Sequence, residues 1–139
     1  MITTADIADI LFEKCKALGT EVFRRGAIPD GCVKKERVVI LPKEQSPETY
    51  WQKSFVEVNI CVPDIGNGVA NISRLQELER LAKRLFNGAA GEYDSSYYAY
   101  DISSISGINR DEALKCHFVN VRILFQVLNV MEYETIYRN

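Results

Sequence analysis

The sequence predicts an α+β domain, with a mainly antiparallel sheet of four to five strands and two helices packed on one face. Three observations support this prediction. Residues 51–62 alternate between apolar and mixed positions and stop at Pro63, as a strand does. We expect the uniformly apolar set, Val56, Val58, Ile60 and Val62, to face the core, and the mixed set, Phe55, Glu57, Asn59 and Cys61, to face solvent or a neighbour. Residues 73–86 repeat leucine at spacings of three and four, which is typical of an amphipathic helix. Residues 115–130 then alternate again, which indicates a second long strand.

The first part of the chain predicts one helix and two strands. Residues 4–18 place apolar side chains at helical spacing and are followed by Gly19, a residue favoured just past helix ends. Residues 21–25 are a short strand candidate. Residues 37–41 contain three consecutive β-branched side chains, which suit a pleated surface. We expect this strand to end at Pro42, because proline has no N–H to give to the ladder.

Turn residues and polar residues mark the loops of the first half. Residues 27–35 contain the turn sequence Pro-Asp-Gly, and residues 43–49 are polar and contain a second proline, so both are expected loops. Residues 64–71 carry two glycines between a strand and a helix. They lack the lysine of a P-loop and the carboxylates of a calcium loop, so we interpret them as a plain connection.

The second part of the chain predicts one helix and two strands. The helix over residues 73–86 has a capping-box candidate in Ser73 and Gln76 and carries a charged outer face, which we interpret as solvated. Residues 97–105 are the fourth strand, followed by a turn. The last strand, residues 115–130, would be roughly 50 Å long at about 3.3 Å per residue, so it must bend, bulge or project past the sheet.

Size and charge narrow the class of protein. With 139 residues and 15.8 kDa, the chain fits one domain. We expect residues 1–131 to form a single α+β domain and residues 132–139 to be a loose C-terminal tail. The net charge of −2 gives no global reason to bind nucleic acid or an anionic membrane. No signal peptide is evident, and no segment approaches the roughly 18 apolar residues of a spanning helix, so no membrane partner is expected.

The sequence carries no recognisable catalytic, cofactor or metal motif. The four cysteines are far apart, and we interpret them as buried free thiols. The single histidine, His117, lies in a strand and is interpreted as a hydrogen-bonded structural residue. Zinc would need more ligands than this histidine supplies, so we expect no metal and no cofactor. We therefore predict that the protein is not an enzyme.

Two clusters of side chains are candidates for contacts. The first is basic and could meet phosphates, although nearby glutamates dilute it; its members are Arg24, Arg25, Lys34, Lys35 and Arg37. The second is a group of tyrosines, which either form an interface or lie half-buried on an edge strand; its members are Tyr93, Tyr97, Tyr98 and Tyr100. The sequence leaves both pairs of interpretations open.

The order of elements resembles that of a phage protein family. Three features carry the resemblance: the opening helix with the turn FRRGAIPDG, the strand SFVEVNICVPD, and the helix SRLQELERLAKRLF with a final strand ending FVNVRILFQVLNV. They extend over roughly residues 4–130. The pattern is similar to that of the tail-completion proteins of long-tailed bacteriophages, the tail terminator and head–tail joining group.

The resemblance implies a structural role in a phage or prophage. Such subunits form a ring, often a hexamer, that caps the tail tube and joins it to the head connector, in the virion or in the host cytoplasm before assembly. DNA passes through the lumen. The loops over residues 43–49 and 64–71 would then be contact loops. The assembly-contact candidates on this reading are Arg24, Arg25, Lys34, Lys35, Asp64, Asn67, Tyr97, Tyr98 and Tyr100.

The tyrosine-rich segment departs from the family pattern and bears on how subunits would meet. A second hypothesis of a different class therefore stays open. On that hypothesis the chain is a non-catalytic domain that binds a small ligand or regulates a partner, as a dimer across exposed strand edges. A concave apolar pocket with a few polar groups would favour this second hypothesis.

Overall fold

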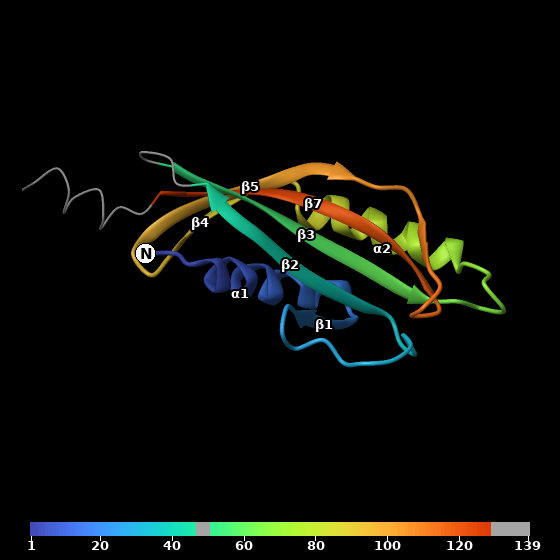
Figure 1. Ribbon diagram of the computed structural model, residues 1–139. Coiled ribbons are helices and arrows are strands. Elements are labelled where there is room, and N and C mark those ends of the chain that lie inside the picture. The colour runs from blue at the N-terminus through green and yellow to red at the C-terminus, as the bar shows by residue number, and fades with distance from the viewer. Residues whose placement is uncertain (47–50, 129–139) are drawn as a thin grey trace, which may run out of the picture.

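In the part of the chain that the structure describes, two α-helices and one mixed sheet of seven strands make up the fold, so the α+β class is confirmed (Figure 1). The computed structural model describes residues 1–46 and 51–128. The elements are α1 (Thr4–Cys15), β1 (Glu21–Arg24), β2 (Arg37–Ser46), β3 (Trp51–Pro63), α2 (Ile72–Leu85), β4 (Ala89–Tyr93), β5 (Ser96–Ile105), β6 (Asn109–Asp111) and β7 (Cys116–Leu128). Along the sheet the strands lie in the order β1-β2-β3-β7-β5-β4, and β6 pairs with β7 off this path.

The two longest strands, β3 and β7, form the centre of the sheet. They pair antiparallel along their full 13 residues, from Trp51 opposite Leu128 to Pro63 opposite Cys116. The other edge of β7 is covered first by β6 and then by β5. The described part of the last strand therefore pairs within the sheet along its whole length. Its ladder with β5 contains a register shift, which is one of the irregularities expected for so long a strand. Residues 129 and 130, which we expected in this strand, lie outside the described residues.

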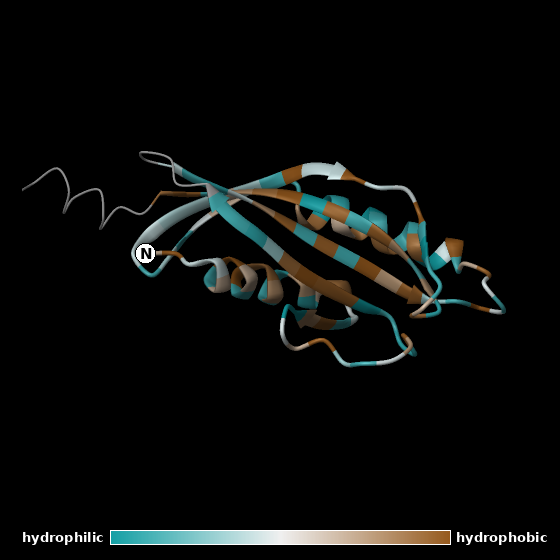
Figure 2. Ribbon diagram, viewed as in Figure 1, coloured by the Kyte–Doolittle hydropathy of each residue, from teal (hydrophilic) through white to brown (hydrophobic). Residues whose placement is uncertain are grey.

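The hydrophobic core lies between the helices and one face of the sheet. The alternation of β3 predicted its inward side chains correctly, since Val56, Val58 and Ile60 have no exposed surface. Figure 2 shows hydrophobic and hydrophilic segments alternating along this strand. From the helices, Leu11 of α1 and Leu78 of α2 join the same buried cluster. Both helices therefore cover the same face of the sheet, as the sequence indicated.

The strand count differs from the expected four to five because two short strands are added. Asp94 and Ser95 adopt left-handed backbone angles, with φ of 48° and 62°. A two-residue turn of this kind closes a hairpin between β4 and β5, although glycine and asparagine are its usual residues. The second addition is β6, three residues within the segment that we expected to be a turn. The sheet also contains one parallel pair, β1 with β2.

The expected end of a strand at Pro42 was wrong. Strand β2 continues through the proline to Ser46, with a register shift between Pro42 and Gln45. The neighbouring β1 pairs only as far as Ile40, so beyond that point β2 is an edge strand. An edge strand tolerates proline because no neighbour needs its N–H on that side. The loop expected over residues 43–49 is thus strand up to Ser46, and its remainder lies outside the described residues, as does the tail over residues 132–139.

Helix ends agree closely with the sequence signals. Thr3 caps α1 in a reciprocal capping box with Asp6. The α-helix ends at Cys15, three residues earlier than expected, and a short 3-10 helix (Lys16–Leu18) follows it, with Gly19 as its C-cap at φ of 75°. Helix α2 begins one residue earlier than expected, and its cap is Asn71, whose side chain accepts a hydrogen bond from the N–H of Arg74. The capping box proposed for Ser73 is therefore wrong, because this residue already lies inside the first turn.

Candidate functional site

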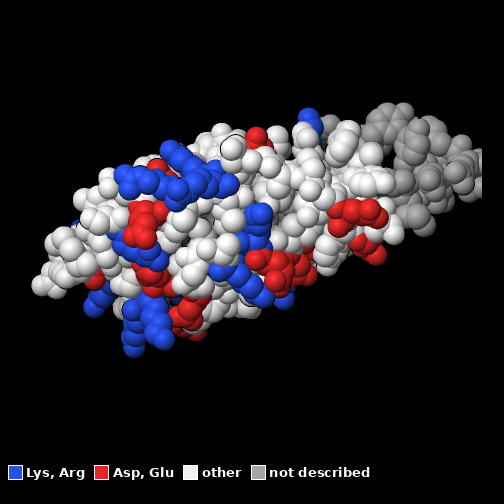
Figure 3. Space-filling view, turned by 180° about the vertical axis from the view of Figure 1, so that it is seen from behind, with Lys and Arg blue, Asp and Glu red and all other residues white. Residues whose placement is uncertain are grey.

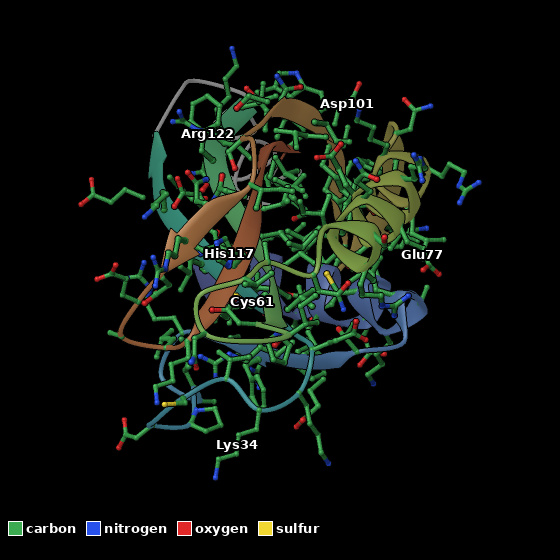
Figure 4. All side chains as sticks on the ribbon, turned by 90° about the vertical axis from the view of Figure 1, so that its right-hand side faces the viewer. Lys34, Cys61, Glu77, Asp101, His117 and Arg122 are labelled. Carbon is green, nitrogen blue, oxygen red and sulfur yellow. The ribbon has the colours of Figure 1, made fainter. Side chains whose placement is uncertain are left out.

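The side of the sheet opposite the helices is only partly covered. At one end, two loops fold over it, and Val33 and Leu114 from these loops pack with Cys61, Cys116 and Phe118. A hydrogen bond of 2.8 Å from the N–H of Val33 to the carbonyl of Leu114 ties the two loops together. Within residues 1–46 and 51–128, no loop or helix packs over the other end of this side. Figure 4 shows this arrangement, with Glu77 on the helix side of the molecule and Arg122 on the opposite side.

Apolar side chains gather on the uncovered end, which we call the open face. Its apolar members are Trp51, Phe55, Tyr97, Leu124 and Leu128. Leu128 pairs with both Trp51 and Tyr97, and Leu124 pairs with Phe55. Paired residues on neighbouring strands point to the same side of a sheet, so these side chains form two rows. A third row, made of Lys53, Gln126 and Ala99, lies between them. Trp51 is 40% exposed and Tyr97 is 50% exposed. Two large aromatic side chains thus lie open to solvent in one row.

Polar groups border these rows. The guanidinium carbon of Arg122 lies 3.9 Å from the centroid of the Phe55 ring, in cation–π geometry. Glu57, which pairs with Arg122 across the strands, meets the ammonium of Lys43 at 3.4 Å. A hollow of about 480 Å³ adjoins the open face between β4, β5 and β7, and Asp101 and Leu124 help to line it. The open face therefore consists of two apolar rows with a partly polar row between them, charged groups at its border and a hollow beside it.

The tyrosine segment divides between the two sides of the sheet. Tyr97 lies on the open face, whereas Tyr98 and Tyr100 pair with core residues of β7 and point toward the helices. The rings of Tyr98 and Tyr100 stack with Phe125 at centroid distances of 5.4 and 5.5 Å. Tyr100 is 5% exposed, and burial raises the pKa of its hydroxyl. Among these three candidates, Tyr97 is therefore the one placed to meet a partner.

The basic residues do not form one surface. Arg24 makes an ion pair with Asp9 of α1, whereas Arg25, Lys34 and Lys35 are exposed. Arg37, which the sequence grouped with them, is only 7% exposed. On the face drawn in Figure 3, positive and negative side chains interleave, apart from one patch of Lys and Arg along the upper edge.

The loop after β3 forms the opposite end of the molecule from Trp51. Asp64 turns inward, and its carboxylate accepts a 2.6 Å hydrogen bond from Nδ1 of His117. The histidine thus has the structural hydrogen bond that the sequence predicted. Asn67 is exposed at the turn. The exposed apolar residues of this end are Ile65, Val69 and Ile72, which are 68%, 53% and 53% exposed.

The described part of the chain contains neither a metal-binding cluster nor a membrane-spanning helix. Within residues 1–46 and 51–128, no group of three or more His, Cys, Asp and Glu side chains is placed to hold a metal ion. In the same two segments, no helix has the length and apolar character needed to cross a membrane.

Sequence reasoning did not single out the open face. The alternation of residues 51–62 did place Phe55 away from the core, and that of residues 115–130 grouped Leu124 with polar neighbours on one side of the strand. The signal in the sequence was that these two positions, on strand sides that otherwise carry mainly polar residues, hold large apolar side chains. Whether another segment of the chain covers them depends on the tertiary path, which local periodicity does not report.

Comparisons with known proteins bear on the fold. No family model matches this chain, and a search of curated proteins also finds no match. One solved structure is similar over 88% of this chain and 91% of its own, with a TM-score of 0.58 and 15% sequence identity. Its name states no activity, and at this identity the likeness concerns the fold alone.

Proposed function

We propose that this chain is a structural tail-completion subunit of a phage or prophage, which assembles into a ring and joins the tail tube to the head connector. The observation that supports this proposal most is the open face. Its exposed row of Trp51 and Tyr97 has the composition of a protein interface, because Trp and Tyr are enriched at interface centres. Charged residues on its border match the polar rim of such interfaces.

In this proposal neighbouring subunits meet side by side through the open face. The hollow of about 480 Å³ beside it accepts a side chain from the neighbouring subunit. An isologous contact would stop at a dimer, whereas contact between two different patches continues around a closed ring. The patch that meets the open face is therefore on another part of the surface. A ring of six subunits, as the sequence resemblance implies, is the assembly that we propose.

The two ends of the molecule have separate roles in this proposal. Strand β3 runs for 13 residues from the open face to the loop that carries Ile65 and Val69. At about 3.3 Å per residue, that distance is roughly 40 Å. This loop end contacts the tail tube or the head connector. The exposed Lys34 and Lys35 precede β2 near the same end and face the lumen through which DNA passes.

Paired substitutions test the proposal. Trp51→Lys adds a charge to the centre of the open face and should weaken self-association roughly thirtyfold, the effect typical of an interface hot spot. Tyr97→Lys should act in the same direction. Ile65→Lys is the matched control, because Ile65 is 68% exposed and lies at the opposite end. Sedimentation velocity over a range of protein concentrations reports the assemblies.

The expected pattern is a ring for the unmodified chain and for Ile65→Lys, and smaller species for both open-face variants. If all four proteins sediment alike, the open face is not the contact between subunits. Circular dichroism of each variant distinguishes lost assembly from lost folding.

A second function is supported by a different observation. A small hollow at the other end of the same side holds a buried arginine and apolar walls, which is the composition of a small-ligand site. On this alternative the chain is a binding domain. Ligand binding at this hollow does not depend on the formation of a ring.

A further inference from the structure

A hollow of about 190 Å³ lies where the two loops fold over the sheet. Five of its lining residues are apolar: Ile28, Val39, Leu41, Leu114 and Phe118. The polar lining residues are Arg37, Asn59, Cys61 and Asp111. The strands β2, β3 and β7 form its floor, and the loops supply Ile28 and Leu114 as walls. Its volume equals about six times the ~30 Å³ that one water molecule occupies in the liquid.

Arg37 is the unusual member of this lining. It is 7% exposed, and its Nε lies buried without a hydrogen-bond partner in the structure. Among residues 1–46 and 51–128, no carboxylate makes an ion pair with it, whereas Arg24 and Arg74 each have one. A buried guanidinium without an ion-pair partner is costly, because burial removes its hydration. The Asp111 carboxylate lines the same hollow but makes no ion pair with Arg37 in the described residues.

Two thiols stand next to this arginine. Cys61 lies directly opposite Arg37 on the neighbouring strand, and Cys116 lies next to Cys61 on β7. Cys116 lowers the pKa of the Cys61 thiol by hydrogen bonding, and Arg37 lowers it further. A lowered thiol pKa means that the surroundings of Cys61 favour a negatively charged group. A protonated thiol, however, carries no charge to balance the guanidinium.

Asp111 limits the charge of a ligand. It lines the same hollow, and one of its carboxylate oxygens accepts a 3.0 Å hydrogen bond from the N–H of Leu114. A ligand that carried a second negative charge would meet this carboxylate. A cation would meet Arg37 instead. The walls are apolar apart from these groups, so the remainder of the ligand is uncharged.

We propose that this hollow binds a small monocarboxylate with an apolar body, whose carboxylate pairs with the Arg37 guanidinium. Guanidinium and carboxylate match in geometry and form two parallel charge-assisted hydrogen bonds. The hydrocarbon part lies against Val39 and Leu41 on the floor and Leu114 on the wall. The Asn59 side chain also lies on the floor. Its Oδ1 accepts a 2.6 Å hydrogen bond from Nδ2 of Asn120, so this oxygen already has a partner within the protein.

Hexanoate is the probe for this site, and hexanamide is its neutral analogue of the same shape. Titration of the isotope-labelled full chain, followed by amide NMR, should give saturable shifts around the hollow with a Kd of about 1 mM or tighter. Hexanamide should bind roughly ten- to a hundredfold more weakly, because it lacks the charge that pairs with the guanidinium. Succinate should be similarly weak because of its second carboxylate.

Variants assign the contact to Arg37. Arg37→Met removes the guanidinium and should reduce hexanoate affinity by the same ten- to a hundredfold. Arg25→Met is the matched control, since Arg25 is exposed and outside the lining. Leu41→Trp fills the hollow while Arg37 remains, so it should abolish binding even if Arg37→Met does not fold.

Two results would overturn the proposal. One is an unmodified chain that shows no saturable shifts with hexanoate. The other is equal binding of hexanoate and hexanamide, since Arg37 would then have no role. The sedimentation of Arg37→Met reports on ring assembly separately, so failure of this site and failure of the proposed function are distinguishable.

Discussion

Replacing Leu78 by alanine tests the placement of α2 on the sheet. Leu78 has no exposed surface and lies in the core cluster between this helix and the central strands. The substitution removes three carbon atoms, which at about 0.8 kcal/mol each account for about 2.4 kcal/mol of lost transfer free energy. The two layers cannot close the space fully, so the remaining cavity should raise the loss to about 3 to 4 kcal/mol.

Urea unfolding followed by circular dichroism at the helix band measures this loss. A chain of this length has a free energy of unfolding of about 7 to 15 kcal/mol, so the variant should remain folded with a clearly lower midpoint. Leu81→Ala is the matched control on the same helix, because Leu81 is only half-buried. It should lose roughly half as much as Leu78→Ala. A loss below about 0.5 kcal/mol at both positions would refute the helix placement.

Two further predictions concern packing and ionisation. A Cβ on Gly91 would lie 2.6 Å from the hydroxyl of Tyr98, whose ring is held by stacking, so Gly91→Ala should lower stability by about 1 to 3 kcal/mol in thermal unfolding. Gly107→Ala, with nothing within 4 Å, should change it little, and equal effects would refute the packing argument. Burial raises the pKa of Cys15 to about 12 from 9.0, so this thiol stays protonated in the folded protein while it ionises in the unfolded chain. Stability should therefore fall as pH rises from about 9 toward 12. Iodoacetamide at neutral pH should label Cys32 rather than Cys15, and labelling of both in the native state would contradict the burial.

Much of the fold was predictable because its strongest signals are local. The period-two pattern of residues 51–62 fixed which side chains face the core, and the leucine spacing of α2 fixed its buried side. The β4–β5 hairpin was missed because its turn uses Asp94 and Ser95, which seldom adopt left-handed angles. Pro42 ended the strand prematurely in the prediction because a single sequence does not report that β2 lies on an edge at that point.

The candidate sites were less predictable because each depends on coverage by distant segments. Arg37 looked like a surface cation beside Lys34 and Lys35, yet a loop buries it. Tyr98 and Tyr100 looked like contact residues, yet their even positions on β5 turn them into the core with Phe125. The register that decides this alternation is set by β7, which follows later in the chain.

The solution mass across a concentration series tests the central claim of ring assembly most directly. Light scattering coupled to size exclusion should show a rise from 15.8 kDa at low concentration to about 95 kDa, the mass of six subunits. A plateau at that mass, without further growth, is the signature of a closed ring. A mass that stays at one or two subunits across the series would contradict the proposed assembly.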